Sequence, residues 1–193
     1  MKWISVFCGS SFGNDEVYAQ QAALLGKTLA EQNIGLVYGG AKVGLMGVLA
    51  NSALQAGGKV IGVLPLFLQT TEIAHTGLTK LVLVDSLHER KAKMNELCNG
   101  IIALPGGYGT MEEFFEIITW GQLRLHTKPM GILNVGGFYD NLILFVQKMV
   151  DKGFLKKENQ EMLLTDTNID SLLTRMEQYV APEVGKWIDW RET

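Results

Sequence analysis

Residues 100–113, GIIALPGGYGTMEE, decide the fold and raise the question of what the protein binds. Gly100–Leu104 is a short, continuous apolar run, typical of a strand buried on both faces of a sheet. Gly106, Gly107 and Gly109 follow it, and a helical pattern extends over Met111–Leu123. Glycines let the backbone approach a ligand closely, and the free N–H groups where a helix begins attract an anion. We therefore expect a strand–turn–helix unit with a phosphate site at its turn.

The same alternation of apolar run and amphipathic stretch is repeated along the chain. Strands are predicted at Trp3–Cys8, Gly35–Tyr38, Lys59–Leu64, Lys80–Val84, Gly100–Leu104 and Met130–Val135. Helices are predicted at Asp15–Gln32, Gly44–Ala56, Ser86–Cys98, Met111–Leu123 and Tyr139–Lys152, with two shorter ones around Lys157–Leu164 and Ile169–Tyr179. Strand and helix in alternation indicate an α/β fold, in which a doubly wound parallel sheet carries helices on both faces.

Glycine-rich turns follow three of the predicted strands: Gly9-Ser10-Ser11, Gly39-Gly40 and Gly106 to Gly109. Sheets of this class bind ligands in the crevice at the carboxyl ends of their strands. Any strand-to-helix turn favours glycine, so one such turn alone would mean little; three predict a single ligand crevice. Ser10 and Gly40, with Met46 and Met94 from nearby helices, join the candidate binding residues.

Length and composition bound the class of protein. The chain has 193 residues, which we divide into one nucleotide-binding domain over 1–180 and a tail of unknown role over 181–193. A formal net charge of −3 does not indicate binding to nucleic acid or to an acidic membrane. Cys8 and Cys98 show no metal-ligand spacing, and no apolar run is long enough for a membrane span. We expect a cytoplasmic protein with reduced thiols and no metal.

Two stretches imitate nucleotide-binding loops. Gly26-Lys27-Thr28 resembles the end of a Walker A loop, but Gln21 stands where that motif needs its first glycine, and the tripeptide lies in a helical pattern. The run from Cys8 to Gly13 does not match the dinucleotide fingerprint, and no acidic residue ends the second strand. Binding of ATP through such a loop, or of a dinucleotide, is therefore disfavoured.

Glu113 stands at the end of the opening stretch and allows two interpretations. We expect Thr110 to cap a helix that begins at Met111. Thr110 and Glu113 then match a capping box, in which the acid bonds back to the N–H of the cap residue. The alternative is that Glu113 is catalytic, and spacing alone favours neither.

Two cations lie on the inward face of the preceding helix. Ser86 and Glu89 form a second capping-box pattern that starts this helix. Its inward stripe is predicted to consist of Leu87, Met94, Leu97 and Cys98. Arg90 and Lys91 fall on the same stripe, whereas His88 falls off it and should be exposed. Buried cations need partners, so they either form internal salt bridges, extend their stems to solvent, or meet an anionic ligand in the crevice.

A nucleotide explains why a phosphate cradle should lie beside a carboxylate. With the phosphate on the glycine loop and the cations, the acid lies over the ribose. Cleavage of the bond between ribose and base builds positive charge on the sugar, as in glycoside hydrolysis. A fixed carboxylate attracts that charge as it develops, which favours the transition state over the bound substrate.

Residues 38–47 (YGGAKVGLMG), 86–91 (SLHERK) and 105–113 (PGGYGTMEE) together resemble the LOG (Lonely Guy) family, and the likeness runs from about Ile4 to Gly153. The family consists of cytokinin riboside 5′-monophosphate phosphoribohydrolases. The resemblance implies a Rossmann-like fold, a homodimer, and hydrolysis of adenosine-type 5′-monophosphates to free base and ribose 5-phosphate without metal or cofactor. Plant members often have three glycines where this chain has Gly39-Gly40-Ala41, which indicates a bacterial-type branch whose preferred base can differ.

The resemblance also implies the site residues. The catalytic pair falls on Arg90 and Glu113. The substrate-contacting positions fall on Glu72, Lys91, Gly106, Gly107, Tyr108, Gly109, Thr110, Met111, Glu112 and Thr119. The family is often labelled lysine decarboxylase, but pyridoxal chemistry needs a Schiff-base lysine with phosphate and ring partners, and the sequence does not indicate such a setting.

A second hypothesis comes from a different class of protein. Molybdenum-cofactor carriers share the glycine-rich phosphate loop on the same fold, and a carrier needs the cradle without a catalytic pair. Whichever holds, Phe114–Leu125 carries more large apolar side chains than one contact between helix and sheet needs. We expect a homodimer that buries part of this stretch.

Overall fold

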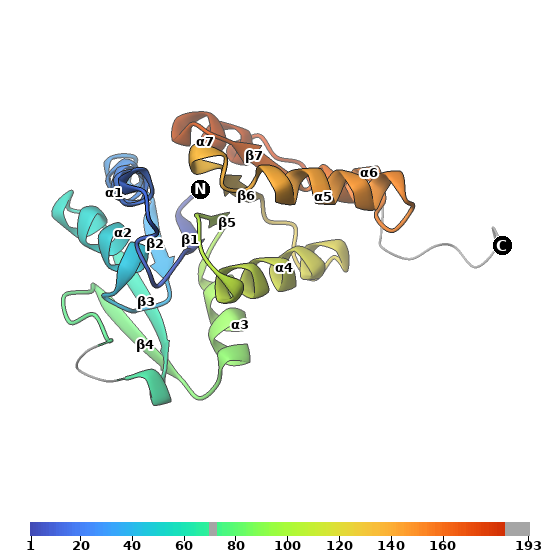
Figure 1. Cartoon of the computed structure of the whole chain (residues 1–193). Coiled ribbons are helices and arrows are strands. Elements are labelled where there is room, and N and C mark those ends of the chain that lie inside the picture. The colour runs from blue at the N-terminus through green and yellow to red at the C-terminus, as the bar shows by residue number, and fades with distance from the viewer. Residues whose placement is uncertain (70–72, 184–193) are drawn as a thin grey trace.

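The computed structural model describes residues 1–69 and 73–183, and within them the chain forms a seven-stranded, all-parallel sheet in the order β4-β3-β2-β1-β5-β6-β7 (Figure 1). The strands are β1 (Trp3–Phe7), β2 (Gly35–Tyr38), β3 (Val60–Pro65), β4 (Lys80–Val84), β5 (Gly100–Ala103), β6 (Met130–Leu133) and β7 (Leu163–Asp166). The helices are α1 (Glu16–Glu31), α2 (Gly44–Gln55), α3 (Leu87–Leu97), α4 (Tyr108–Gln122), α5 (Asp140–Asp151), α6 (Lys157–Gln160) and α7 (Ile169–Glu177). Two 3-10 turns, η1 (Leu66–Leu68) and η2 (Val135–Gly137), complete the order. The predicted doubly wound α/β fold is confirmed.

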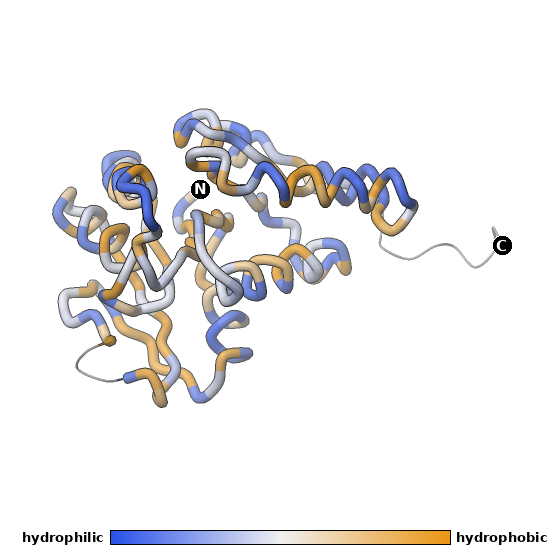
Figure 2. Tube along the Cα trace, viewed as in Figure 1, coloured by the Kyte–Doolittle hydropathy of each residue, from blue (hydrophilic) through white to orange (hydrophobic). Residues whose placement is uncertain are grey.

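The sheet separates two apolar cores. One core packs one face of the sheet, from β3 to β6, against α1, α2 and α7, and the other packs the opposite face against α3, α4 and the start of α5. Within β1, Ile4 and Val6 belong to the first core and Phe7 to the second. A strand covered on both faces needs apolar residues at odd and even positions alike, which explains the unbroken apolar runs. Figure 2 shows the same contrast, with apolar strands and helices whose outer faces are polar.

The helix predicted around Lys157–Leu164 begins where expected but is only half as long. The helix α6 ends at Gln160, and Leu163–Asp166 forms the edge strand β7, which pairs in parallel with β6 from Met130↔Leu163 onward. An edge strand is covered less than a central one, and all four residues of β7 are half-buried. Because β7 is only half-buried, only its first two residues are apolar. A run this short cannot be distinguished from the end of an amphipathic helix.

The Walker-like tripeptide lies within α1, as predicted. Gly26 is buried where α1 crosses α2, and a Cβ at this position would clash with the carbonyl oxygen of Leu49 and lie 3.1 Å from the amide nitrogen of Ala53. Glycine here lets the backbones of α1 and α2 come into contact. Gly26 is therefore needed for helix packing and is not part of a nucleotide-binding loop.

The boundaries of the domain stay a prediction. Regular structure extends from Trp3 to Glu177, and residues 184–193, most of the expected tail, lie outside the described residues. Among the residues that the structure does describe, none of the helices has the length and apolar character needed to cross a membrane.

Candidate functional site

The turns that follow β1, β2 and β5 meet at the carboxyl edge of the sheet. The amide of Gly9 donates to the carbonyl oxygen of Pro105 at 3.0 Å, and the amide of Leu45 donates to that of Gly9 at 3.1 Å. Gly44 packs directly on the backbone of Ser10. The expectation that these glycine-rich turns adjoin one another is therefore confirmed.

A pocket of about 310 Å³ lies over the turns after β1 and β5. Ser10 and Gly106 belong to its lining, and so do the aromatic residues Phe12, Tyr18 and Phe138. The rings of Tyr18 and Phe138 meet edge to face with centroids 5.8 Å apart. This aromatic wall was missed from the sequence, although Phe12 directly follows the first glycine-rich turn and gave a signal.

The helix α4 begins earlier than predicted. Its N-cap is Gly107, in extended conformation, and its first residue is Tyr108. The capping role expected of Thr110 is therefore wrong: Thr110 lies inside the first turn, buried against Gly106, where a Cβ would come within 2.7 Å of the Cβ of Thr110. The N–H groups of a first helical turn have no acceptor within their helix. The free N–H groups of α4 therefore lie directly after the glycine loop.

Glu113 is paired with Arg90 across the two helices. Arg90 Nη1 lies 3.3 Å from Glu113 Oε1, and both side chains are almost buried, with 12% and 13% of their surfaces exposed. Glu113 is thus ion-paired to α3, and the capping box with Thr110 fails because Gly107 caps the helix. Burial raises the pKa of Glu113, and the Arg90 charge offsets this only in part. A carboxylate kept from water in this way interacts strongly with any nearby charge.

Two uncharged residues, Gly39 and Cys8, lie beside this pair. Gly39, at the end of β2, leaves the space that the Arg90 guanidinium occupies, since a Cβ there would clash with Nη2 and lie 3.1 Å from Met46 Sδ. Cys8, at the end of β1, is buried nearby, and burial together with the Glu113 charge raises the pKa of its thiol. The thiol therefore stays protonated at neutral pH and places no charge beside the ion pair.

The neighbouring cation has a different environment. Lys91 is buried, and its Nζ contacts the carboxylates of both Glu112 and Glu116 on α4. The alternative of an internal salt bridge thus holds for Lys91. Glu116 was missed from the sequence, although its i,i+4 spacing from Glu112 places both acids on one face of the helix.

The helix α3 begins at Leu87 behind the predicted cap residue. The hydroxyl of Ser86 accepts from the amide of Glu89 at 3.1 Å, but Glu89 Oε2 accepts from the amide of Asp85 at 2.7 Å, one residue further back than a capping box requires. Placing Leu87 on the inward stripe is wrong, since 48% of it is exposed. As the first helical residue it lies beyond the edge of the core. His88 is exposed, as expected.

Other predicted site residues lie apart from the pair. Met94 is fully buried in the core below α3, and 97% of Tyr108 is exposed. Gly40 is buried, and its carbonyl oxygen accepts from the amide of His75. Met111 is half-buried, and Glu72 lies outside the described residues. Ser10 lines the crevice pocket and Met46 adjoins Gly39, while the binding roles of all these residues stay predictions.

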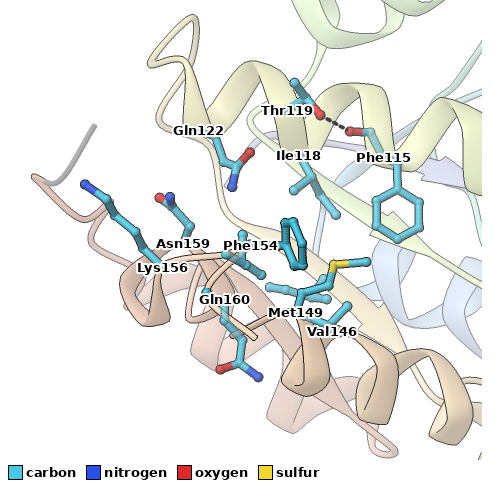
Figure 3. Close-up of a pocket in the computed structure, with 13 residues that line it drawn as sticks. Phe115, Ile118, Thr119, Gln122, Val146, Met149, Phe154, Lys156, Asn159 and Gln160 are labelled. Atoms are coloured by element: carbon cyan, nitrogen blue, oxygen red, sulfur yellow. Dashed lines mark hydrogen bonds between the residues drawn. The ribbon is translucent and has the colours of Figure 1, made fainter. Parts of the chain in front are cut away.

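Thr119 faces a second, larger pocket. Its hydroxyl donates to the carbonyl oxygen of Phe115 at 2.8 Å (Figure 3). Both residues belong to the wall of a groove of about 570 Å³ between α4 and α5. Its lining comprises Phe115, Ile118, Thr119, Gln122, Val146, Met149, Gly153, Phe154, Leu155, Lys156, Asn159, Gln160 and Leu163. We refer to this set as the α4–α5 groove.

The site provides no evident metal centre. Within residues 1–69 and 73–183, His, Cys, Asp and Glu side chains form no cluster of three or more that could hold a metal ion. The charged groups present suit an organic anion whose sugar or base lies next to a carboxylate.

Comparison with known proteins identifies the family. A family model described as "Possible lysine decarboxylase" matches residues 46–176. A cytokinin riboside 5′-monophosphate phosphoribohydrolase of Arabidopsis thaliana is 46% identical over 92% of this chain and 83% of its own length. The chain belongs to the LOG family. Another LOG-family relative with the same description, from Oryza sativa subsp. japonica, is 41% identical over 97% of this chain and 77% of its own length.

Solved structures agree with the LOG-family fold. The molybdenum cofactor carrier protein of Chlamydomonas reinhardtii matches with a TM-score of 0.69 at 21% identity, over 92% of this chain and 96% of that one. The molybdenum cofactor binding protein of Rippkaea orientalis gives a TM-score of 0.70 at 19% identity, with the same coverage. At such identities the likeness shows the shared fold alone.

Proposed function

We propose that the protein hydrolyses the N-glycosidic bond of adenosine-type 5′-monophosphates, with or without an N6 substituent, and releases the free base and ribose 5-phosphate. The observation that carries the proposal is the desolvated Arg90–Glu113 pair beside the glycine loop and the first turn of α4. The names of the LOG-family relatives support the same reaction.

In this proposal the phosphate binds the free N–H groups of the first turn of α4, within reach of the glycine loop. Glu113 lies about one helical turn further along and attracts the positive charge that develops on the ribose. The bond from C1′ to the base nitrogen breaks with its electrons on the base. Water adds to C1′ and gives a proton to Glu113, and an equivalent proton passes from Glu113 to the departing base, directly or through solvent, which restores the carboxylate. A raised pKa makes Glu113 a better acceptor of that proton than an ordinary carboxylate.

Arg90 holds Glu113 in this role. Its contact through Nη1 orients the carboxylate and stabilises the ionised form. Within the described part of the chain, Arg90 Nε is buried and has no hydrogen-bond partner. We assign Arg90 and Glu113 as the catalytic residues and Gly106, Gly107, Gly109 and Thr110 as the phosphate loop.

We further propose that the protein acts as a homodimer in the cytoplasm, with residues 1–180 as a single domain. The α4–α5 groove supports the dimer, because it is largely apolar and Phe154 at its edge is 89% exposed. Cys8 and Cys98 are both free thiols, which fits a reducing compartment.

The test is base release by wild type and by Glu113→Gln. Purified wild type should release adenine from AMP, or the modified base from isopentenyl-AMP, as followed by chromatography. Glu113→Gln should retain the nucleotide affinity but lose about a hundred-fold or more in kcat, the range for removal of a group that stabilises transition-state charge. Glu96→Gln, on the exposed side of α3, is the matched control and should keep wild-type turnover.

Unchanged kcat in Glu113→Gln would contradict the assignment of this residue. Release of neither base by wild type, combined with tight retention of a pterin ligand, would instead favour the carrier hypothesis.

A further inference from the structure

Lys91 is the most completely enclosed charge near the candidate site. Its side chain is 3% exposed, and its Nζ lies against Glu112 and 2.5 Å from Glu116 Oε2. Burial alone lowers the pKa of Lys91, but hydrogen bonds to Glu112 and Glu116 outweigh that effect and raise it. Lys91 is therefore a fully charged ammonium whose contacts come from α4.

This environment is a poor one for binding phosphate. Two carboxylates around one ammonium give the group a net negative charge, which repels an anion. An ammonium also has three donors; one of them is hydrogen-bonded to Glu112, and Nζ forms an ion pair with Glu116 as well. Arg90, one residue earlier, contacts a single carboxylate and keeps Nε without a partner among the described residues. Of the two adjacent cations, Arg90 is the more exposed and contacts fewer carboxylates.

The pattern of contacts ties α3 to α4 in a fixed rotation. Lys91 grips one face of α4 through Glu112 and Glu116, while Arg90 meets Glu113 on the adjoining face. Consecutive residues of a helix point about 100° apart, so the direction of one side chain sets that of the other. A rotation of α3 about its axis would break the contacts of Lys91 with its two acids and would move Arg90 away from Glu113. The Lys91 contacts therefore oppose that rotation.

We propose that Lys91 is a positioning residue whose clamp on Glu112 and Glu116 sets the Arg90–Glu113 contact, and that it does not bind the substrate phosphate. The inference departs from the substrate-binding role that the family resemblance implies for Lys91. The inference adds a role for Lys91 to the proposed function. It depends on that function only where kcat is measured.

The first test compares turnover and binding in Lys91→Met. We expect kcat to fall about ten-fold or more, because a small misplacement of catalytic groups has an effect of this size. The Kd of ribose 5-phosphate, measured by calorimetry, should change by less than about ten-fold, since no charge-assisted bond to phosphate is lost. A rise in Kd beyond that limit would overturn the proposal. Lys91→Arg should restore most of the turnover, because a guanidinium can also bridge two carboxylates.

The second test keeps the lysine and removes its partners, in case Lys91→Met does not fold. The double variant Glu112→Gln, Glu116→Gln should reproduce the loss of kcat at unchanged Kd. If Lys91 were a phosphate ligand, release from both acids would tighten binding of ribose 5-phosphate instead, and that result would refute the clamp.

A third readout needs neither turnover nor ligand. In a crystal structure of the double variant, the distance between Arg90 Nη1 and Glu113 Oε1 should exceed its present 3.3 Å and leave ion-pairing range. An unchanged contact would overturn the inference. Failure of wild type to release base would count against the proposed function, while this structural readout would still decide the role of Lys91.

Discussion

The crevice at the strand ends and the α4–α5 groove lie on the same helix, and they differ in size and chemistry. The groove is larger, at about 570 Å³ against about 310 Å³ for the crevice pocket, and it is lined mainly by apolar side chains. The crevice pocket is lined by two glycine-rich turns and an aromatic wall. The buried Arg90–Glu113 ion pair does not line this pocket but lies at the same edge of the sheet, against Gly39. Chemistry on a nucleotide needs directed charge, whereas an apolar groove suits another protein surface. In the proposed function the smaller pocket is therefore the one that binds the nucleotide.

The largest effect should come from the crevice. Arg90→Met removes the cation that orients Glu113, and we expect kcat to fall about a hundred-fold. Lys93→Met, on the same helix but paired on the surface with Glu96, is the control and should keep its turnover. The measurement is steady-state release of base from AMP. If kcat of Arg90→Met fell by less than about three-fold, the result would contradict a catalytic role for the crevice.

A substitution in the α4–α5 groove should weaken dimer formation and leave the chemistry of the crevice unaffected. Phe154→Asp places a charge on an exposed ring at its edge, and it should raise the dimer dissociation constant about ten-fold or more, as expected for loss of an aromatic anchor. Analytical ultracentrifugation measures this directly. Leu24→Asp on α1, also exposed, should leave the dimer intact. Monomeric wild type at micromolar concentration would contradict the role given to the groove.

A smaller effect is expected from Gly109→Ala, which separates binding from folding. Gly109 lies in the first turn of α4, and a Cβ there would meet no described atom within 4 Å. Alanine should therefore stabilise the helix, by up to about 1 kcal/mol. It should also weaken AMP binding about ten-fold, because the methyl group obstructs the free N–H groups. Calorimetry with AMP and thermal unfolding check both; Gln20→Ala, exposed on α1, should bind AMP as wild type does.

The smallest effect concerns pH. Burial raises the pKa of Glu113 above 4.5, so the acid limb of kcat/KM should lie above that pH. Arg90 lowers this pKa, so the limb should move to still higher pH in Arg90→Met. Because the folded state holds the proton more tightly than the unfolded state, stability falls as pH rises between the two pKa values. Thermal unfolding against pH should show this slope in wild type and lose it in Glu113→Gln.

Much of this organisation could be predicted from the sequence because it depends on local chemistry. Continuous apolar runs gave six of the seven strands, β1 to β6, and glycine turns after three of them gave the ligand edge. Inward cations on α3 predicted a charged site, because a buried Arg90 needs a partner. These inferences need only neighbouring residues and the period of a helix or strand.

What could not be predicted depends on contacts between distant segments. The strand β7 exists because β6 offers it an edge, and the role of Lys91 depends on Glu116, 25 positions away in the sequence. The start of α4 moved from Met111 to Tyr108 because Gly107 adopts an extended conformation and caps the helix itself. Spacing alone cannot distinguish that arrangement from a cap at Thr110.

The stretch Leu104–Pro105 is held from both sides. The amide of Leu104 donates to the carbonyl oxygen of Phe7, and the carbonyl oxygen of Leu104 accepts from the hydroxyl of Tyr139 at 2.7 Å. The carbonyl oxygen of Pro105 accepts from Gly9. An incoming anion thus meets a cradle whose entrance is already fixed by neighbouring strands, and little binding free energy is lost to ordering it. On the proposed function, Tyr139 would then contribute to nucleotide affinity by ordering this stretch.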